Sequence, residues 1–321
     1  MIYEFAVDPA VAAGWHDRHA YRFFKGSFGL GKKRILAQYP GTKWKQMVMR
    51  EFHEMFRDRD PVAKQNAKLK LDALLRHLTE ASSNRNRPCP GPWVDGALAE
   101  HQRRRFQGIL VHSAGDEPFI DASTLDDDDP SWNPAEIRVD RSAFAITRAL
   151  MPMLRHARKL IFIDPYIEPG DDRYSSVLTA IVSEAQKNRE ADEAVSVEVH
   201  TAVDREFRAG GKLQTPDAEQ REAEALVQRI QETLRPHLGS GARLAVVIWS
   251  DKNVQIQGEL IHNRYLLCER GGVMFGHGLD AGKGKDTLTV LAAEPFREVR
   301  SIYNEGAKVL RLVVAAEITS P

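Results

Sequence analysis

Residues 159–164 have the sequence KLIFID, a short apolar run with two isoleucines that ends on an aspartate and predicts a buried strand. An amphipathic helix is expected next, then an alternating strand and a second amphipathic helix, at Ser175–Ala185, Val195–Val199 and Ala218–Leu234. Five more strands are expected at Leu244–Trp249, Leu260–Cys268, Val273–Gly276, Thr287–Leu291 and Val309–Ala315. Strands that first alternate with helices and then follow one another predict an α/β domain with a mixed sheet flanked by helices.

The residues before this region have a different character. Residues 1–80 predict a small, basic, helical N-terminal domain, because apolar residues recur at helical spacing between Trp44 and His77, with a break near Pro61. Residues 81–100 begin with ASSNRNRPCPGPWVD, whose Ser, Asn, Pro and Gly content predicts a linker. The α/β domain is then expected to occupy residues 101–321.

Composition restricts the class of protein. The chain has 321 residues, of which 42% are hydrophobic and 28% charged, so there is ample material for a core. No apolar run approaches the roughly 18 residues of a membrane span, and the N-terminus does not resemble a secretory signal. The two cysteines, Cys89 and Cys268, fit a reducing compartment and exclude a zinc site built from cysteines. We expect a soluble cytoplasmic protein with no membrane partner.

Charge is unevenly distributed, although the formal net charge is zero. Residues 1–110 contain 20 Lys and Arg against 11 Asp and Glu, which fits either a polyanion-binding module or a part that attracts the acidic remainder. Between Tyr21 and Arg50, basic residues that include Lys32, Lys33 and Arg34 alternate with aromatic ones. Cations and stacking aromatics together are typical of a nucleic-acid surface. The alternative, which the composition favours slightly, is an aromatic core with solvated basic residues around it.

Two motifs for other chemistry are incomplete. Residues 26–33, GSFGLGKK, match part of a phosphate-binding loop, but Lys33 stands where Ser or Thr would hold magnesium, and no buried strand precedes them. Asp126–Asp129 lack the spacing of a calcium loop and predict a solvated acidic segment. The sequence therefore predicts no metal and no other cofactor.

The strongest functional signal is the sequence IHNRYLLCE at 261–269, followed by RGGVMF and then GHGLD at 276–280. It resembles the signature of the phospholipase D superfamily: H-x-K, four residues, D, six residues, then G-[GS] with a polar residue just beyond. His262, Arg264, Glu269 and Gly276 keep the full spacing, with Arg for Lys, Glu for Asp, and His277 where Ser or Gly is usual.

Further upstream, IDPY at 163–166 looks like phospholipase D-like proteins of bacterial restriction and anti-phage loci. The resemblance covers roughly residues 140–315. It implies a phospholipase D-like domain in which Asp164, Tyr166, Gly276 and Asp280 help to bind substrate.

The side chains themselves support phosphate chemistry. Two residues apart on a strand, His262 and Arg264 project from the same face. A guanidinium offers a planar fork to two phosphate oxygens, and an imidazole can attack phosphorus or transfer a proton. We expect Glu269 to orient an imidazole and His277 to stabilise or protonate the reacting group. The alternative is that these are ordinary strand-end histidines beside a surface arginine.

The superfamily builds its active site from two such motifs, and this chain has one. Either a homodimer pairs two copies, or a local group such as His277 completes the site, or the module only binds phosphate. His112 and His200, each near a strand end, are other sources of an imidazole.

The leading hypothesis is a metal-independent nuclease with His262 as nucleophile, acting on DNA in preference to RNA, in anti-phage defence. The alternative is a non-catalytic phospholipase D-like subunit that binds nucleic acid or a partner protein in a defence complex.

Overall fold

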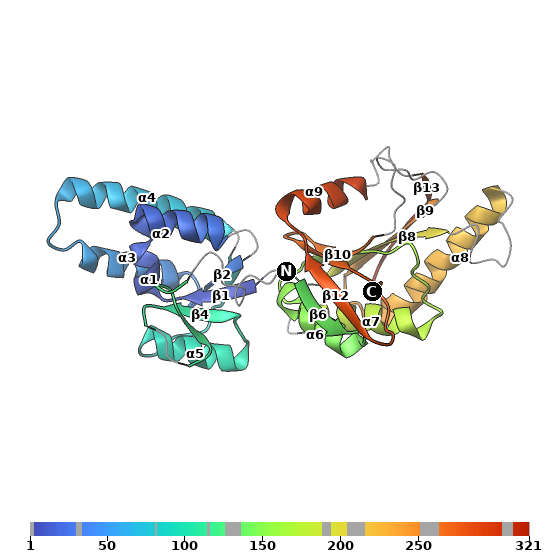
Figure 1. The fold of residues 1–321 in the computed structure, drawn as a ribbon, viewed down its shortest axis with the longest axis horizontal. Coiled ribbons are helices and arrows are strands. Elements are labelled where there is room, and N and C mark those ends of the chain that lie inside the picture. Colours follow the sequence, from blue (N-terminus) through green and yellow to red (C-terminus); the bar gives the residue numbers. More distant parts are fainter. Residues whose placement is uncertain are drawn as a thin grey trace. The chain divides into compact units, whose positions relative to one another are not determined.

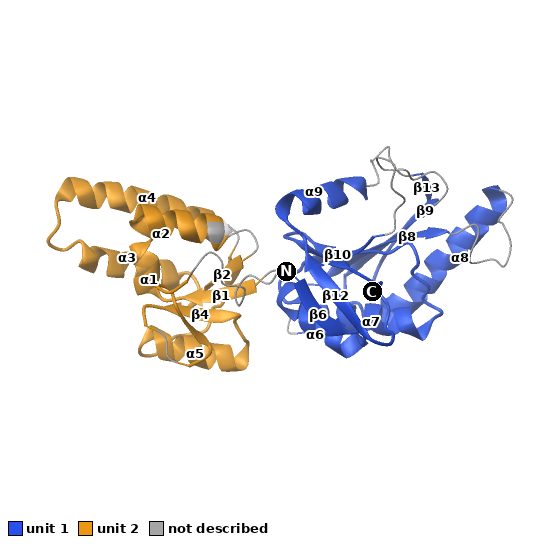
Figure 2. Ribbon diagram, viewed as in Figure 1, with its two compact units in different colours: residues 1, 134–321 blue, residues 2–133 orange. Residues whose placement is uncertain are grey.

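The computed structural model describes residues 3–29, 34–80, 82–113, 116–125, 136–187, 194–203, 216–250, 263–303 and 311–320. The chain divides into two compact units, Ile2–Asn133 and Pro134–Pro321 (Figure 2). The division lies about thirty residues beyond the predicted linker at 81–100, which belongs to the first unit.

The first unit contains a five-stranded parallel sheet in the order β3-β2-β1-β4-β5. Its strands are β1 (Tyr3–Val7), β2 (Arg34–Gln38), β3 (Ser83–Asn84), β4 (Gly108–Val111) and β5 (Phe119–Asp121). Its helices are α1 (Pro9–Ala13), η1 (Gly14–His16), α2 (Arg18–Arg22), η2 (Phe23–Ser27), α3 (Lys43–Met55), α4 (Pro61–Glu80) and α5 (Trp93–Arg103). Helices α1–α4 lie on one side of the sheet and α5 on the other (Figure 1). This is the strand order of a doubly wound α/β sheet.

The predicted helical domain at 1–80 and linker at 81–100 are therefore wrong. Strands β1 and β2 have five residues each and are buried along almost their whole length, so they lack the alternation that identifies a strand. Within β1, Glu4 is a buried charge that pairs with Arg85, a residue of the supposed linker. The two helices expected between Trp44 and His77 are confirmed as α3 and α4.

The second unit is built on an eight-stranded mixed sheet in the order β13-β9-β8-β7-β10-β11-β12-β6, and this confirms the predicted class of fold. Strands β7, β8 and β9 are parallel to one another, and the other neighbours pair in antiparallel fashion. The strands are β6 (Glu136–Asp140), β7 (Lys159–Ile163), β8 (Ser196–Val203), β9 (Arg243–Ser250), β10 (Arg264–Cys268), β11 (Gly272–Phe275), β12 (Lys285–Val290) and β13 (Leu312–Thr319). The helices are α6 (Ala143–Leu154), α7 (Asp172–Gln186), α8 (Pro216–Leu234), η3 (Arg235–His237) and α9 (Ala293–Ile302).

Helices cover the two faces of this sheet unequally. Figure 2 shows α9 on one side and α6 and α7 on the other. Ile161 and Ile163 of β7 pack with Val299 and Tyr303 at the α9 side. Leu160 and Phe162 alternate with them and are fully buried on the opposite face. Within the described residues, no helix is both long and apolar enough to cross a membrane.

Candidate functional site

Polar side chains gather at one end of the central strands of the second unit. Strand β7 ends just before Asp164, and its antiparallel neighbour β10 begins at Arg264. Strand β11 pairs with β10 and ends just before the turn Gly276–Asp280. The register of the three strands therefore brings these separate segments of the predicted site to a single edge.

Asp164 is the buried centre of this edge, with 1% of its surface exposed. Its Oδ1 accepts the backbone N–H of Tyr166 at 2.8 Å, and its Oδ2 accepts that of Leu279 at 3.0 Å. Burial raises the pKa of this carboxyl, although the two N–H donors partly oppose the effect. Because each oxygen accepts a backbone N–H of a separate segment and the side chain is buried, we assign Asp164 to holding the Gly276–Asp280 turn against β7.

The guanidinium of Arg264 lies between Asp164 and Tyr166. Its Nε is 4.0 Å from Oδ1 of Asp164, and its central carbon is 5.0 Å from the centre of the Tyr166 ring. That Nε is buried and has no hydrogen-bond partner among the described residues, while 24% of the side chain is exposed. A guanidinium held by one long ion pair and a ring face keeps donors for phosphate oxygens.

His277 is held by Asp286, a residue that the sequence analysis missed. Oδ1 of the buried Asp286 accepts the backbone N–H of His277 at 3.1 Å, the ring Nδ1 at 3.1 Å, and the N–H of Thr287 at 2.7 Å. Because this oxygen acts as an acceptor, Nδ1 carries the proton and Nε2 is left for chemistry. The His277 side chain is 58% exposed. An aspartate near the start of a predicted strand has no distinctive spacing, so no sequence signal identified it.

Gly276 and Gly278 allow the turn to approach the carboxylates of Asp286 and Asp280 closely. A Cβ on Gly276 would lie 2.9 Å from Oδ1 of Asp286, and one on Gly278 would lie 3.0 Å from Oδ1 of Asp280. Asp280 itself accepts a 2.6 Å hydrogen bond from Arg141 and lies 3.6 Å from an Arg173 nitrogen. Its negative charge is thus compensated, and we assign it to holding the turn and not to binding substrate.

Glu269 lies at the other end of β10. Its carboxylate accepts the backbone N–H of Arg158 at 2.9 and 3.2 Å and that of Lys159 at 3.3 Å, at the start of β7. Five strand residues separate it from the Arg264 end, a distance of about 17 Å. Within the described part of the chain, Glu269 therefore lies at the opposite end of β10 from His277, and Asp286 is the carboxylate that contacts the His277 ring.

Among the other predicted residues, the described part of the chain brings His200 to this edge through its backbone carbonyl oxygen, which accepts the N–H of Asp164 at 3.1 Å. His262, Lys32 and Lys33 lie outside the described residues. His112 follows β4 in the first unit. His200 is buried in β8, where its Nδ1 accepts the indole N–H of Trp249 at 3.0 Å and its Nε2 contacts a Glu198 oxygen at 2.5 Å. Both of its ring nitrogens are therefore occupied.

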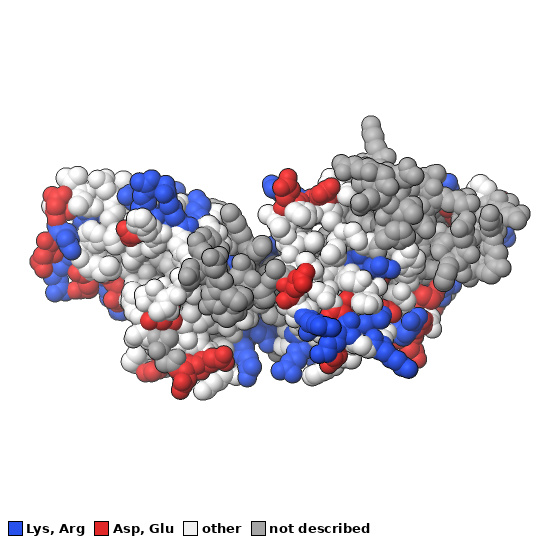
Figure 3. Space-filling view, in the orientation of Figure 1, with Lys and Arg blue, Asp and Glu red and all other residues white. Residues whose placement is uncertain are grey.

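The aromatic residues of the basic stretch at 21–50, together with Arg34, lie mainly in the core of the first unit. Arg34 is 2% exposed; it donates to the carbonyl oxygen of Phe28 and lies 4.8 Å above that ring. Burial lowers the pKa of its guanidinium to about 10. Four aromatic residues of the stretch are also buried: Phe24, Phe28, Tyr39 and Trp44. Figure 3 shows acidic and basic side chains interspersed on the visible face of each unit. The described part of this stretch therefore fits the aromatic-core interpretation.

Replacing Arg34 with alanine is expected to lower the free energy of unfolding by about 1–3 kcal/mol, because it removes a buried hydrogen bond to the Phe28 carbonyl oxygen and the contact with the Phe28 ring. The salt dependence of nucleic-acid binding should not change, since this charge is not at the surface. Denaturant titration and binding titrations at several salt concentrations measure the two effects. Arg50→Ala is the control, because Arg50 is exposed and pairs only weakly with Glu51. A flattened salt slope in Arg34→Ala without loss of stability would contradict this assignment.

Among the described residues, no group of three or more His, Cys, Asp or Glu side chains could hold a metal ion. No model of a known protein family matches the chain, and no curated protein matches it. The chemical interpretation therefore depends on the geometry of the edge and on the residues of the motif.

Proposed function

We propose that the second unit is a metal-independent phosphodiesterase that cleaves nucleic acid through a phosphohistidine intermediate. The observation that supports this most directly is the pairing of the exposed His277 with the buried Asp286, at the same edge as Arg264. A buried carboxylate that accepts Nδ1–H fixes the tautomer and the orientation of the ring, as in other catalytic His–Asp pairs. Arg264 supplies the positive charge for the non-bridging phosphate oxygens.

In the proposed reaction, a nitrogen of His262 attacks phosphorus and forms a P–N bond while the P–O bond to the leaving nucleoside breaks. Protonated His277 gives its Nε2 proton to the departing oxygen. Neutral His277 then takes a proton from water, whose oxygen attacks phosphorus and breaks the P–N bond, so that both histidines return to their starting states. His262 stands two positions before Arg264 in the sequence, which supports its inclusion. In-line displacement separates nucleophile and acid, which suits two different histidines.

This version needs only one chain. It differs from the homodimer, one of the three alternatives that the single motif left open, in which a second His262 would act as the acid. The Asp286–His277 pair favours the single-chain version, because it already provides an oriented imidazole at this edge.

Labelled DNA and RNA oligonucleotides incubated with the protein in excess EDTA are expected to be cut, with DNA preferred. Quenching with detergent at alkaline pH, followed by alkaline electrophoresis, should retain label on the protein, and heating in acid should release it, since phosphohistidine is stable to alkali and labile to acid. Cleavage that requires added magnesium would contradict the proposal.

A second outcome would favour the runner-up function. Binding without cleavage, weakened by Arg264→Ala, would indicate a phospholipase D-like binding subunit. Arg264 in place of the usual lysine is the observation in its favour, because it keeps phosphate affinity while changing the geometry. A role in anti-phage defence rests on the resemblance of residues 163–166 alone.

A further inference from the structure

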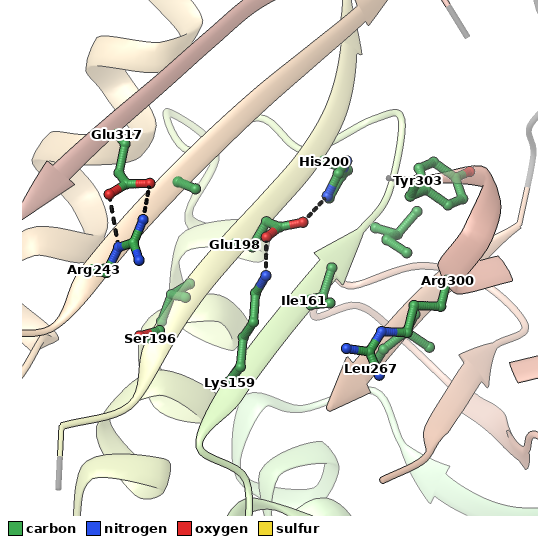
Figure 4. A pocket seen from close by; sticks show the side chains of 13 residues that line it. Lys159, Ile161, Ser196, Glu198, His200, Arg243, Leu267, Arg300, Tyr303 and Glu317 are labelled. Atoms are coloured by element: carbon green, nitrogen blue, oxygen red, sulfur yellow. Dashed lines mark hydrogen bonds and ion pairs between the residues drawn. The ribbon is translucent and has the colours of Figure 1, made fainter. Parts of the chain in front are cut away.

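A cavity of about 450 Å³ lies on the sheet face beside α9, over strands β7 to β10 (Figure 4). Its floor is apolar and includes Ile161, Ala245 and Leu267. Neither Arg264 nor His277 lines it, so it is distinct from the proposed phosphodiesterase site. Its volume falls within the range of about 300–1,000 Å³ that is typical of small-molecule sites.

The walls of the cavity carry three cations and two carboxylates. Lys159 pairs with Glu198, and Arg243 makes a bidentate pair with Glu317 at 2.7 and 2.8 Å. Arg300 contacts no carboxylate among the described residues, and its Nη1 reaches only a backbone carbonyl oxygen at 3.5 Å. The lining therefore has one positive charge that the surrounding carboxylates do not compensate.

A hydrogen-bonded network that is buried at Trp249 and His200 and partly exposed at Glu198 and Lys159 fixes the polar wall of the cavity. His200 bridges Trp249 and Glu198, and the second oxygen of Glu198 binds Lys159. Although burial opposes ionisation, the hydrogen bonds from His200 and Lys159 hold the pKa of Glu198 at about 2. Glu198 therefore stays charged and paired with Lys159. The groups that remain available to a ligand are the guanidinium of Arg300, which can bind an anion, and the apolar side chains of the floor.

We propose that this cavity binds a small organic anion whose apolar body lies on Ile161, Ala245 and Leu267 and whose negative group faces Arg300. Arg300 is exposed at the rim, where it can meet a negative group, and small-molecule sites commonly combine an apolar surface with a few polar or charged groups that orient the ligand. Because the pocket wall includes Ile163, the residue before Asp164, a ligand here would lie next to the strand end that carries the catalytic edge.

A matched pair of fluorescent probes tests the charge and the floor separately. 1-Anilinonaphthalene-8-sulfonate carries an anionic group on a naphthalene ring, and N-phenyl-1-naphthylamine has the same rings without that group. The sulfonate is expected to bind at one saturable site and more tightly than the neutral probe. Arg300→Glu should weaken the sulfonate about five- to tenfold and leave the neutral probe unchanged.

Two further variants complete the design. Arg297→Glu makes the same charge change one turn earlier on α9, at an exposed residue that does not line the cavity, and should not affect either probe. Ala245→Trp fills the floor and should abolish binding of both, with circular dichroism confirming that the variant is folded. Absence of saturable binding, or binding that Arg300→Glu and Ala245→Trp leave unchanged, overturns the proposal.

Discussion

Cleavage of nucleic acid in EDTA is expected to fall by about 10⁴-fold or more in His262→Ala, since no other residue forms the P–N bond. In His277→Ala the fall should be about 10²- to 10⁴-fold, the usual contribution of a general acid. Single-turnover cleavage of an end-labelled oligonucleotide measures both. Cleavage that survives His262→Ala would remove the nucleophile assignment.

The two histidines can be separated by changing the leaving group. A phosphodiester of p-nitrophenol does not need a proton on departure, so His277→Ala should recover much of its activity with that substrate. His262→Ala should not, because it lacks the nucleophile. Equal loss with both substrates would show that His277 is not the acid.

Neutralising Asp286 or Glu269 compares a carboxylate that contacts His277 with one that lies at the opposite end of β10. Asp286→Asn removes the charge that orients and stabilises the His277 ring, and is expected to slow cleavage about 10²-fold or more. Glu269→Gln, at the far end of β10, should leave cleavage near the wild-type rate and lower stability only slightly. A larger loss of cleavage rate in Glu269→Gln than in Asp286→Asn would support the role that the motif implies for Glu269.

Mixing experiments distinguish one chain from two. If a site is complete within one chain, adding inactive His262→Ala protein should leave the activity of the wild-type chains unchanged. If two copies share a site through a two-fold interface, the added variant should form inactive mixed dimers and lower that activity.

The sequence predicted that Asp164, Arg264 and the Gly276–Asp280 turn lie close together, because strand geometry is local. A short hairpin determines that Arg264 and the Gly276–Asp280 turn emerge at one end, and the apolar run before Asp164 adds the neighbouring strand. The same geometry separates Glu269 from these residues, since five residues along a strand carry it to the opposite end. Asp286 could not be found, because its contact with His277 depends on how β12 pairs with β11.

In the first unit, charge patterns could not reveal the fold. Parallel strands buried on both faces carry no alternation, and the charge of Glu4 made β1 look unlike a buried strand. The 20 basic residues counted in residues 1–110 include Arg34 and Arg85, which are both buried. Composition gives the charge of a residue but not its partner. A basic residue that pairs with a buried group stabilises the core and does not contribute to a binding surface.

Arg85→Ala is expected to lower the free energy of unfolding of the first unit by about 3–5 kcal/mol. The Arg85 guanidinium donates to Glu4 and to Glu100 at 3.0 Å, and all three side chains are buried. It also donates to the carbonyl oxygen of Arg104 at 2.7 Å. Removing the cation leaves two carboxylates in the interior without it, which costs far more than losing a surface pair.

Arg103→Ala is the matched control for this prediction. Arg103 also pairs with Glu100, at 2.8 Å, but its side chain is about half exposed, so its loss should cost no more than about 1 kcal/mol. Denaturant titration followed by tryptophan fluorescence and circular dichroism measures both variants. Equal, small losses would show that the buried cluster contributes no more than a surface pair.

The pH dependence provides a further check. Burial opposes the charge of Glu100, but hydrogen bonds from Arg103 and Arg85 outweigh it and lower its pKa below the ordinary 4.5. In the wild type this stabilisation is present above pH 4.5 and is lost as the pH falls through the lowered value. In Arg85→Ala the Glu100 carboxylate loses that cation and binds protons more tightly when folded, so protonation relieves the cost of burying its charge. Arg103 also lowers the pKa of Glu100, so the stability deficits of both variants should narrow as the pH falls below about 5, and that of Arg85→Ala should narrow by more because it is the larger. A deficit that stays constant between pH 7 and 4 would indicate that lost packing, and not the buried charge of Glu4 and Glu100, destabilises the variant.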